Sequence, residues 1–248
     1  MFIGDATKAL LQLQGKNAVL EVAQEKSAKS SLIQNVKSIF ASSGPKNALI
    51  TVCMYMIIQQ LSGINAIFFY STSIFISAGI PVEWSGICSV GLSTINVLGV
   101  FAAVALIDKK GRLFLFFWSV AVMCVMCVLT TVLLSFPDNQ TIAYMSVLSV
   151  FIYVFFFEIG AGPIPWMMAG EYMPTQYSAG TAAIGASTNW FCCFIVGLAF
   201  PPLQDALDQY VFVIFGVICG LGAVYIKLRG IESKGKTVEQ IQTEFSRR

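Results

Sequence analysis

Two short stretches of this chain combine hydrogen-bonding side chains with helix breakers inside otherwise apolar sequence. Residues 59–65 read QQLSGIN, and residues 158–166 read EIGAGPIPW. Side-chain amides carry donors and acceptors together, which is what the adjacent hydroxyl groups of a neutral polyol require. Proline lacks an N–H donor and clashes with the preceding helical turn, so the second stretch cannot remain a regular helix. The predicted helix breaks are Gly63, Gly160, Gly162, Pro163 and Pro165.

Other polar residues are spaced so that they could converge on these stretches. Their spacing predicts one helix face shared by Gln59, Gly63 and Tyr70, with Gln60 and Asn65 beside it, and a second stripe that ends at Asn96. Any single amide is most simply a contact between helices, worth about 0.6 kcal/mol. Five of them drawn from four apolar segments indicate a site. The second stripe comprises Ser85, Ser89, Ser93 and Asn96, and the fifth apolar segment adds Asn189 and Trp190.

Two further side chains suit a sugar. The indole of Trp166 could lie against the apolar face of a pyranose and donate one hydrogen bond. Glu158 is a deep carboxylate, which must be protonated, hydrated or hydrogen-bonded within a membrane. We favour a structural or substrate-contacting role for it over proton coupling, because no histidine or second deep acid could complete a proton relay.

The chain has no histidine, which excludes Ser-His-Asp and Cys-His catalysis and most transition-metal sites. Seven cysteines lie in apolar stretches, and the CxxC formed by Cys124 and Cys127 has neither a second pair nor a histidine. A net charge of +2 is too small to indicate nucleic-acid binding. The sequence therefore predicts neither an enzyme nor a protein with a metal or cofactor.

Composition predicts a helical membrane protein. Only 11% of the residues are charged, against about 25% in soluble domains. Lysine and arginine are confined to residues 1–46, 109–112 and 227–248, and a span needs about 20 apolar residues. The two gaps predict six transmembrane helices, and the positive-inside rule places both termini in the cytoplasm. The predicted spans are residues 47–76, 84–107, 113–135, 141–168, 180–201 and 208–229, with breaks near residues 79–81, 136–140, 170–180 and 201–209.

The predicted division is into residues 1–45, 46–230 and 231–248, which are cytoplasmic helices, a transmembrane unit and a cytoplasmic tail. Residues 6–15 and 20–40 follow amphipathic helical spacing, although a partly disordered polar leader is the alternative. Within residues 46–230, the first helix of each set of three carries the break. Interrupted helices in corresponding positions of two repeats point to a transporter binding site.

Five stretches make the family resemblance specific. The chain resembles the carboxy-terminal half of the sugar-porter group of the major facilitator superfamily, and within it the facilitative glucose transporters. The stretches cover nearly the whole chain in the family's order: QQLSGINAIFFYSTSIF (59–75), DKKGR (108–112), FFEIGAGPIPWMMAGE (156–171), NWFCCFIVG (189–197) and IESKGKT (231–237).

The resemblance implies half of a major facilitator fold that carries a hexose of the glucose type by facilitated diffusion through alternating access. It also implies a charge cluster of Asp108, Arg112, Glu171 and Glu232 that opens and closes the cytoplasmic side. The expected partners are the hexose, the bilayer, usually of the plasma membrane, and a missing amino-terminal six-helix half. The alternative is a truncated, non-transporting module that associates with full-length transporters. The implied hexose site comprises Gln59, Gln60, Asn65, Asn96, Phe157, Glu158, Trp166 and Asn189.

Overall fold

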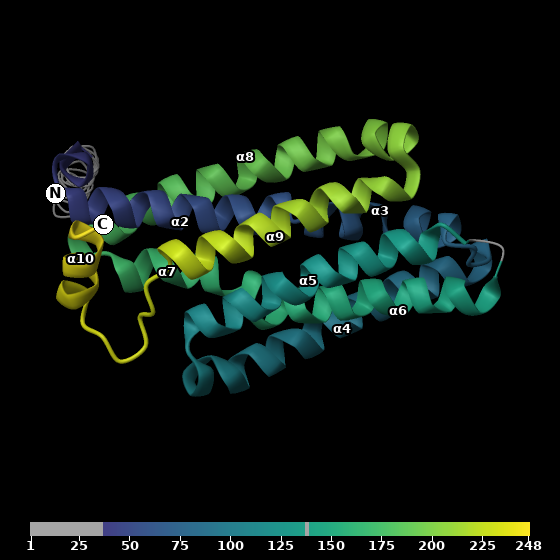
Figure 1. Cartoon of the computed structure of the whole chain (residues 1–248), viewed down its shortest axis with the longest axis horizontal. Helices are drawn as coiled ribbons and strands as arrows, with labels where there is room; N and C mark the ends of the chain where they lie inside the picture. The colour runs from purple at the N-terminus through teal and green to yellow at the C-terminus, as the bar shows by residue number, and fades with distance from the viewer. Residues whose placement is uncertain (1–36, 137–138) are drawn as a thin grey trace, which may run out of the picture.

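The computed structural model describes residues 37–136 and 139–248, and every regular element in them is a helix (Figure 1). Most of the helices run along the long axis of the molecule, and α10 lies across one end of it. The helices are α2 (Ser43–Leu61), α3 (Ile64–Ser77), α4 (Val82–Lys110), α5 (Arg112–Leu134), α6 (Gln140–Phe156), η1 (Phe157–Ala161), α7 (Ile164–Tyr172), α8 (Thr175–Leu207), η2 (Asp208–Tyr210), α9 (Val211–Arg229) and α10 (Val238–Ser246).

Five helical stretches in the described residues are long and apolar enough to cross a membrane, and some of them contain more than one helix. The last of them, Thr175–Arg229, has 55 residues and contains both α8 and α9. Figure 1 shows the chain reversing direction between these two helices, at η2. The sequence predicts six spans, and the difference in number lies in this last stretch. The other four stretches are Ser43–Ser77, Val82–Lys110, Arg112–Leu134 and Gln140–Tyr172.

Two of the predicted breaks are wrong in extent. Helix α8 continues through Pro201 and Pro202 to Leu207, although the sequence predicts a break there. A proline at position 201 leaves the carbonyl of Gly197 without its helical donor, and the hydroxyl of Tyr70 donates to that carbonyl instead, at 3.1 Å. The predicted break across residues 170–180 is only residues 173–174, which separate α7 from α8.

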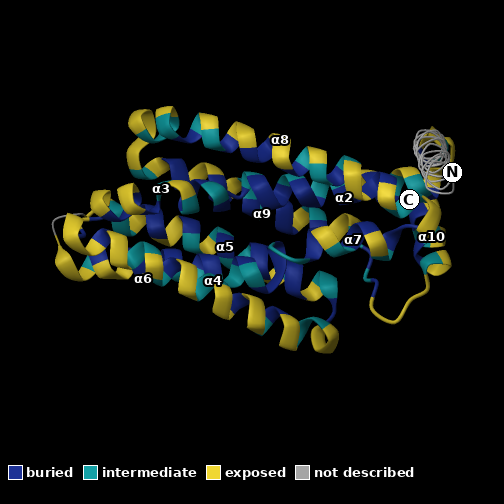
Figure 2. Cartoon of the chain, turned by 180° about the vertical axis from the view of Figure 1, so that it is seen from behind, coloured by how far each residue is buried: buried dark blue, intermediate teal, exposed yellow. Residues whose placement is uncertain are grey.

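The buried residues lie where the helices face one another (Figure 2), and many large apolar side chains are exposed on the outer surface. Helix α5 is central, because it packs against α9, α6 and η1. Tyr55, Phe116 and Tyr153 are fully or almost fully buried there. Helix α4 is the least buried of the five stretches, and it exposes Val90 and Phe101, each 68% accessible. Such a face requires lipid or another protein surface against it.

The carboxy-terminal tail folds back onto the helical unit. Within it, α10 starts with a capping box, in which Thr237 and Gln240 each bond to the other's backbone N–H. Its buried Ile241 and Phe245 face the other helices, and Asn47 of α2 donates to the carbonyl of Phe245 at 2.9 Å. The cytoplasmic helices predicted for residues 1–45 lie mostly outside the described residues.

Candidate functional site

The first break separates α2 from α3 at residues 62–63. Gly63 has a φ of 94°, a backbone conformation that side-chain-bearing residues rarely adopt. A Cβ atom at this position would also lie 2.5 Å from the ring of Phe215. The break contradicts the prediction that Gln59, Gly63 and Tyr70 share one continuous helix face, because α2 ends at Leu61 and Tyr70 itself has non-helical dihedral angles.

The second break is a wide turn between α6 and α7. Residues Phe157–Ala161 form a π-helical turn, and α7 begins at Ile164. The carbonyl of Ala161 would normally accept a hydrogen bond from the residue four positions later, which is Pro165 and has no N–H. The side chain of Gln59 takes over this role, since its Nε2 donates to the carbonyls of Ala161 at 2.7 Å and Gly162 at 2.6 Å.

Four amide side chains form one hydrogen-bonded chain, which we call the amide network (Gln59, Gln60, Asn65 and Asn189). Nδ2 of Asn189 donates to Gln59 at 2.6 Å, and Nε2 of Gln60 donates to Oδ1 of Asn189 at 2.7 Å. Nδ2 of Asn65 then donates to Oε1 of Gln60 at 2.5 Å. The network thus connects α2, α3 and α8 to the second break.

A second polar group lies beside the break. Nδ2 of Asn96, on α4, donates to Oε1 of Glu158 at 2.5 Å. The carboxylate of Glu158 lies against Gly162, since a Cβ atom on Gly162 would be 2.9 Å from its Oε2. Gly162 also accepts from Gln59, so this acid–amide pair (Asn96 and Glu158) and the amide network meet at the same turn.

The two groups differ in how much hydrogen-bonding capacity they have left. Gln59, Gln60 and Asn189 are 3%, 7% and 0% exposed, and their donors and acceptors are directed at one another or at the break. Asn65, Asn96 and Glu158 are only half-buried. Within the described residues, Oδ1 of Asn65, Oδ1 of Asn96 and Oε2 of Glu158 have no hydrogen bond.

The aromatic residues of the predicted site are placed differently from one another. Phe157 is 7% exposed, and its ring lies near Gly162. Trp166 is 44% exposed on α7, and no hydrogen bond joins its indole to the amide network within the described residues. Trp190, next to Asn189 on α8, is 65% exposed.

The serine stripe predicted on α4 does not converge on the amide network. Its hydroxyl groups donate to carbonyls of α4 itself, as Ser93 does to Ser89 at 3.2 Å. Ser89 additionally receives a hydrogen bond from Ser71 of α3, at 2.9 Å. These contacts join α3 to α4, and only Asn96 of the predicted stripe reaches the site.

The predicted charge cluster also comes together, at the end of the molecule that carries α10. Nε of Arg112 pairs with Glu171 at 3.1 Å, and its Nη1 pairs with Asp108 at 3.4 Å. Glu232 does not pair with the guanidinium group. Its carboxylate instead accepts the backbone N–H groups of Arg112 at 3.0 Å and Leu113 at 2.9 Å, which caps the amino terminus of α5.

Three residues that the sequence reasoning missed support these groups. Ser119 accepts the N–H of Ala161 at 3.0 Å, so both sides of the second break are satisfied by side chains. Cys193 accepts from Nδ2 of Asn65 at 3.1 Å, and Ser233 donates to Glu171. Cys193 could have been anticipated from sequence, because it lies four positions after Asn189 and therefore on the same face of the helix. No comparable pattern marks Ser119.

Comparison of the sequence with known protein families finds a family that matches nearly the whole chain. The family described as "Sugar (and other) transporter" matches residues 3–245. Facilitated glucose transporter member 2 of Gallus gallus is 35% identical over 254 residues, which cover 99% of this chain and 47% of that protein. Member 4 of Bos taurus is 34% identical over 250 residues, covering 98% and 49%. The chain therefore spans about half the length of these curated relatives.

Solved structures give the same fold. A double-tryptophan mutant of XylE superposes with a TM-score of 0.72 at 21% identity, over 89% of this chain and 49% of that one. The inward open conformation of the xylose transporter XylE from E. coli superposes with a TM-score of 0.69 at 22% identity, covering 80% and 42%.

Proposed function

The chain belongs to the sugar transporter family, and from that membership and its site we propose that it carries a hexose of the glucose type across a membrane by facilitated diffusion. The observation that supports this most is the meeting of the amide network and the acid–amide pair at one broken helix. Transport requires no covalent chemistry. Polar side chains replace the hydration shell of the sugar while the protein changes the side to which the site is open.

Within this proposal the polar residues divide into two roles. Gln59, Gln60 and Asn189 are positioning residues, because their amides are already engaged in holding the two breaks together. Asn65, Asn96 and Glu158 bind the hexose first, since each has an unused acceptor. The exposed indole of Trp166 supplies an apolar wall for the pyranose ring, and Phe157, whose ring lies near Gly162, adds apolar surface at the break.

We propose that the chain crosses the membrane six times, as two sets of three helices. The first set is α2–α3, α4 and α5, and the second is α6–α7, α8 and α9. The basic residues that flank α10, those of the α4–α5 turn and those at the end of α9 then face the cytoplasm, by the positive-inside rule. This arrangement places both ends of the chain on the cytoplasmic side, by family analogy in the plasma membrane.

The charge cluster is suited to hold one side of the transporter closed. Arg112 and Glu232 join the start of α5 to the segment before α10, and Glu171 at the end of α7 shares Arg112. We propose that these contacts form in one state and separate in the other, as alternating access requires of a bistable element.

The relatives are about twice as long as this chain, so we propose that it acts with a second six-helix half. The half-buried acceptors of Asn65 and Asn96 then face a cavity between the halves, because open polar groups facing lipid would be unfavourable. A non-transporting module that associates with longer transporters is the alternative, supported by the same difference in length.

Uptake of labelled hexose in cells that lack hexose carriers separates these possibilities. The chain would be expressed alone, with a six-helix amino-terminal half of a glucose transporter, and beside a full-length transporter. We expect saturable uptake with the complementary half. Absence of uptake there, together with altered uptake by the full-length transporter, would establish the non-transporting module instead.

A further inference from the structure

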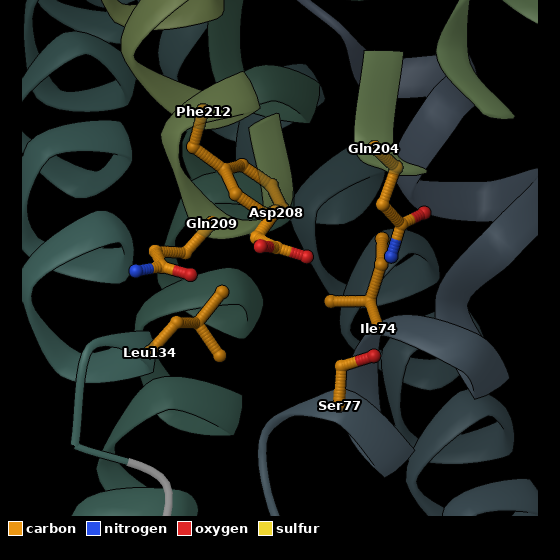
Figure 3. A pocket seen from close by; sticks show the side chains of 7 residues that line it. All are labelled: Ile74, Ser77, Leu134, Gln204, Asp208, Gln209 and Phe212. Carbon is orange, nitrogen blue, oxygen red and sulfur yellow. The ribbon is translucent and has the colours of Figure 1, made fainter. Parts of the chain in front are cut away.

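A cavity of 170 Å³ lies at the end of the molecule opposite α10, away from the amide network. We call it the η2 cavity, and its lining comes from five elements that meet where α8 turns into α9. Figure 3 shows the carboxylate of Asp208 extending into the space between Gln209 on one side and Gln204 with Ser77 on the other. It is lined by Ile74, Ser77, Leu134, Gln204, Asp208, Gln209 and Phe212.

The polar groups of the η2 cavity are unused. Among the described residues, none of the side chains of Ser77, Gln204, Asp208 and Gln209 forms a hydrogen bond or an ion pair. Ser77 and Asp208 are exposed, and the two glutamines are half-buried, so the cavity is accessible. This contrasts with the amide network, in which Gln59, Gln60 and Asn189 bond to one another.

The backbone at Asp208 gives an independent reason to examine this side chain. Its φ is 49° and its ψ is −128°. No other non-glycine residue in the described part of the chain has a positive φ. Glycine is the residue that such a turn favours. Residues held in such sparsely populated backbone conformations cluster at active sites and ligand-binding regions.

The chemistry of the lining fits a neutral monosaccharide. The carboxylate of Asp208 can accept two hydroxyl protons, the amides of Gln204 and Gln209 offer donors and acceptors, and the buried ring of Phe212 provides an apolar wall. An anion would meet a carboxylate and no basic side chain. A simple cation would leave the amide donors unused. The volume of 170 Å³ is of the size of one sugar ring.

We propose that the η2 cavity is a second hexose site, which a sugar occupies on the outer side, apart from the amide network. The inference rests on the proposed function for its substrate class and for the orientation of the chain. It does not require that the chain itself complete transport.

The test uses a reporter thiol at the rim of the cavity. The full chain carrying Ser77→Cys would be reconstituted, and its reaction with a membrane-impermeant thiol reagent would be timed with and without glucose, with the unsubstituted chain giving the background from native cysteines. At about ten times the dissociation constant, glucose should slow the reaction about tenfold, because only the empty site reacts. Equal rates with and without glucose would overturn the proposal.

Two second-site variants separate this site from the amide network. Ser77→Cys with Asp208→Gly should lose the protection while thermal stability is kept or raised, because glycine relieves the positive φ. Ser77→Cys with Asn65→Ala should retain it. Protection that survives Asp208→Gly, or disappears with Asn65→Ala, would assign the effect to the central site and overturn the inference. If uptake fails but protection behaves as expected, the proposed transport function falls and the η2 cavity stands.

Discussion

At the scale of single residues, prolines determine where the polar side chains are needed. The carbonyls of Ala161 and Gly197 both lose their helical donors to a proline four positions later, and each is bound by a polar side chain from α2 or α3. The amide of Gln59 is therefore required by the broken helix whether or not a sugar is present. Polar residues therefore cluster beside the breaks at membrane depth, because the freed carbonyls there need hydrogen-bond donors even without a sugar.

A stability prediction follows for Asn189, which is fully buried and bonds to both Gln59 and Gln60. Asn189→Ala should lower the free energy of unfolding by about 1–2 kcal/mol, between the membrane average for one polar contact and the cost of leaving buried groups unpaired. Thermal unfolding in detergent measures this. The matched control is Ser187→Ala on the same helix, whose hydroxyl bonds only within α8. Equal losses in the two variants would contradict the role of Asn189.

The residues of this site could largely be anticipated from sequence, but their roles could not. Asn65, Asn96 and Glu158 retain open acceptors, whereas Gln59 and Asn189 do not, and all five are simply polar residues in apolar segments. Which amide is saturated depends on contacts between helices more than 100 positions apart in sequence, such as Gln59 with Ala161. Periodicity within one helix carries no such information.

At the scale of elements, each interruption is fixed by close packing as well as by composition. Gly63 combines a φ of 94° with the ring of Phe215 at 2.5 Å from the position of a Cβ atom. Gly160 lets the π-helical turn approach the backbone of α5, since a Cβ there would lie 2.5 Å from the carbonyl of Leu115. The sequence identifies these breakers, yet it also predicts a break at Pro201, where a hydroxyl from Tyr70 preserves the helix.

Gly63→Ala tests the first interruption. It should destabilise the protein by about 1–3 kcal/mol, because it places a side chain at positive φ and against Phe215. Gly86→Ala is the comparison, since nothing lies within 4 Å of a Cβ at this helical position. That variant should be neutral or stabilising by up to about 1 kcal/mol. Thermal melts that fail to separate the two substitutions would show that the α2–α3 break tolerates a regular helix.

Glu232 tests the charge cluster at the start of α5. Glu232→Ala removes an acceptor from the N–H groups of Arg112 and Leu113 and should cost about 1–3 kcal/mol of unfolding free energy. Asp205→Ala on α8 serves as the control and should have little effect, because its exposed carboxylate forms no hydrogen bond or ion pair within the described residues. Chemical denaturation of the two variants measures the difference in unfolding free energy. If Glu232→Ala loses no more stability than the control, Glu232 does not stabilise the start of α5 as a cap.

At the scale of the whole molecule, the charge pattern matches the positions of the long helical stretches. The gaps between basic clusters correspond to these stretches, and the described basic residues lie at or near helix ends or in the segments that flank α10. The short helix α10 was not predicted from the sequence. Its capping box and its apolar residues Ile241 and Phe245 indicate a packed helix only once α2 and α7 are known to lie beside it. The exposed apolar faces, above all that of α4, leave room for lipid or a second half.

The proposed hexose site depends on the open acceptors of Asn65, Asn96 and Glu158, and hexose uptake by Asn65→Ala tests it most directly. The variant would be expressed with a complementary amino-terminal half in carrier-free cells, at matched surface level, beside Ser187→Ala. Loss of the hydrogen bonds that a sugar makes to Asn65 should reduce uptake at least about tenfold, since a hydrogen bond of this kind is worth about 1.4 kcal/mol or more. Uptake by Asn65→Ala equal to that of Ser187→Ala would contradict the assignment of the hexose to this site.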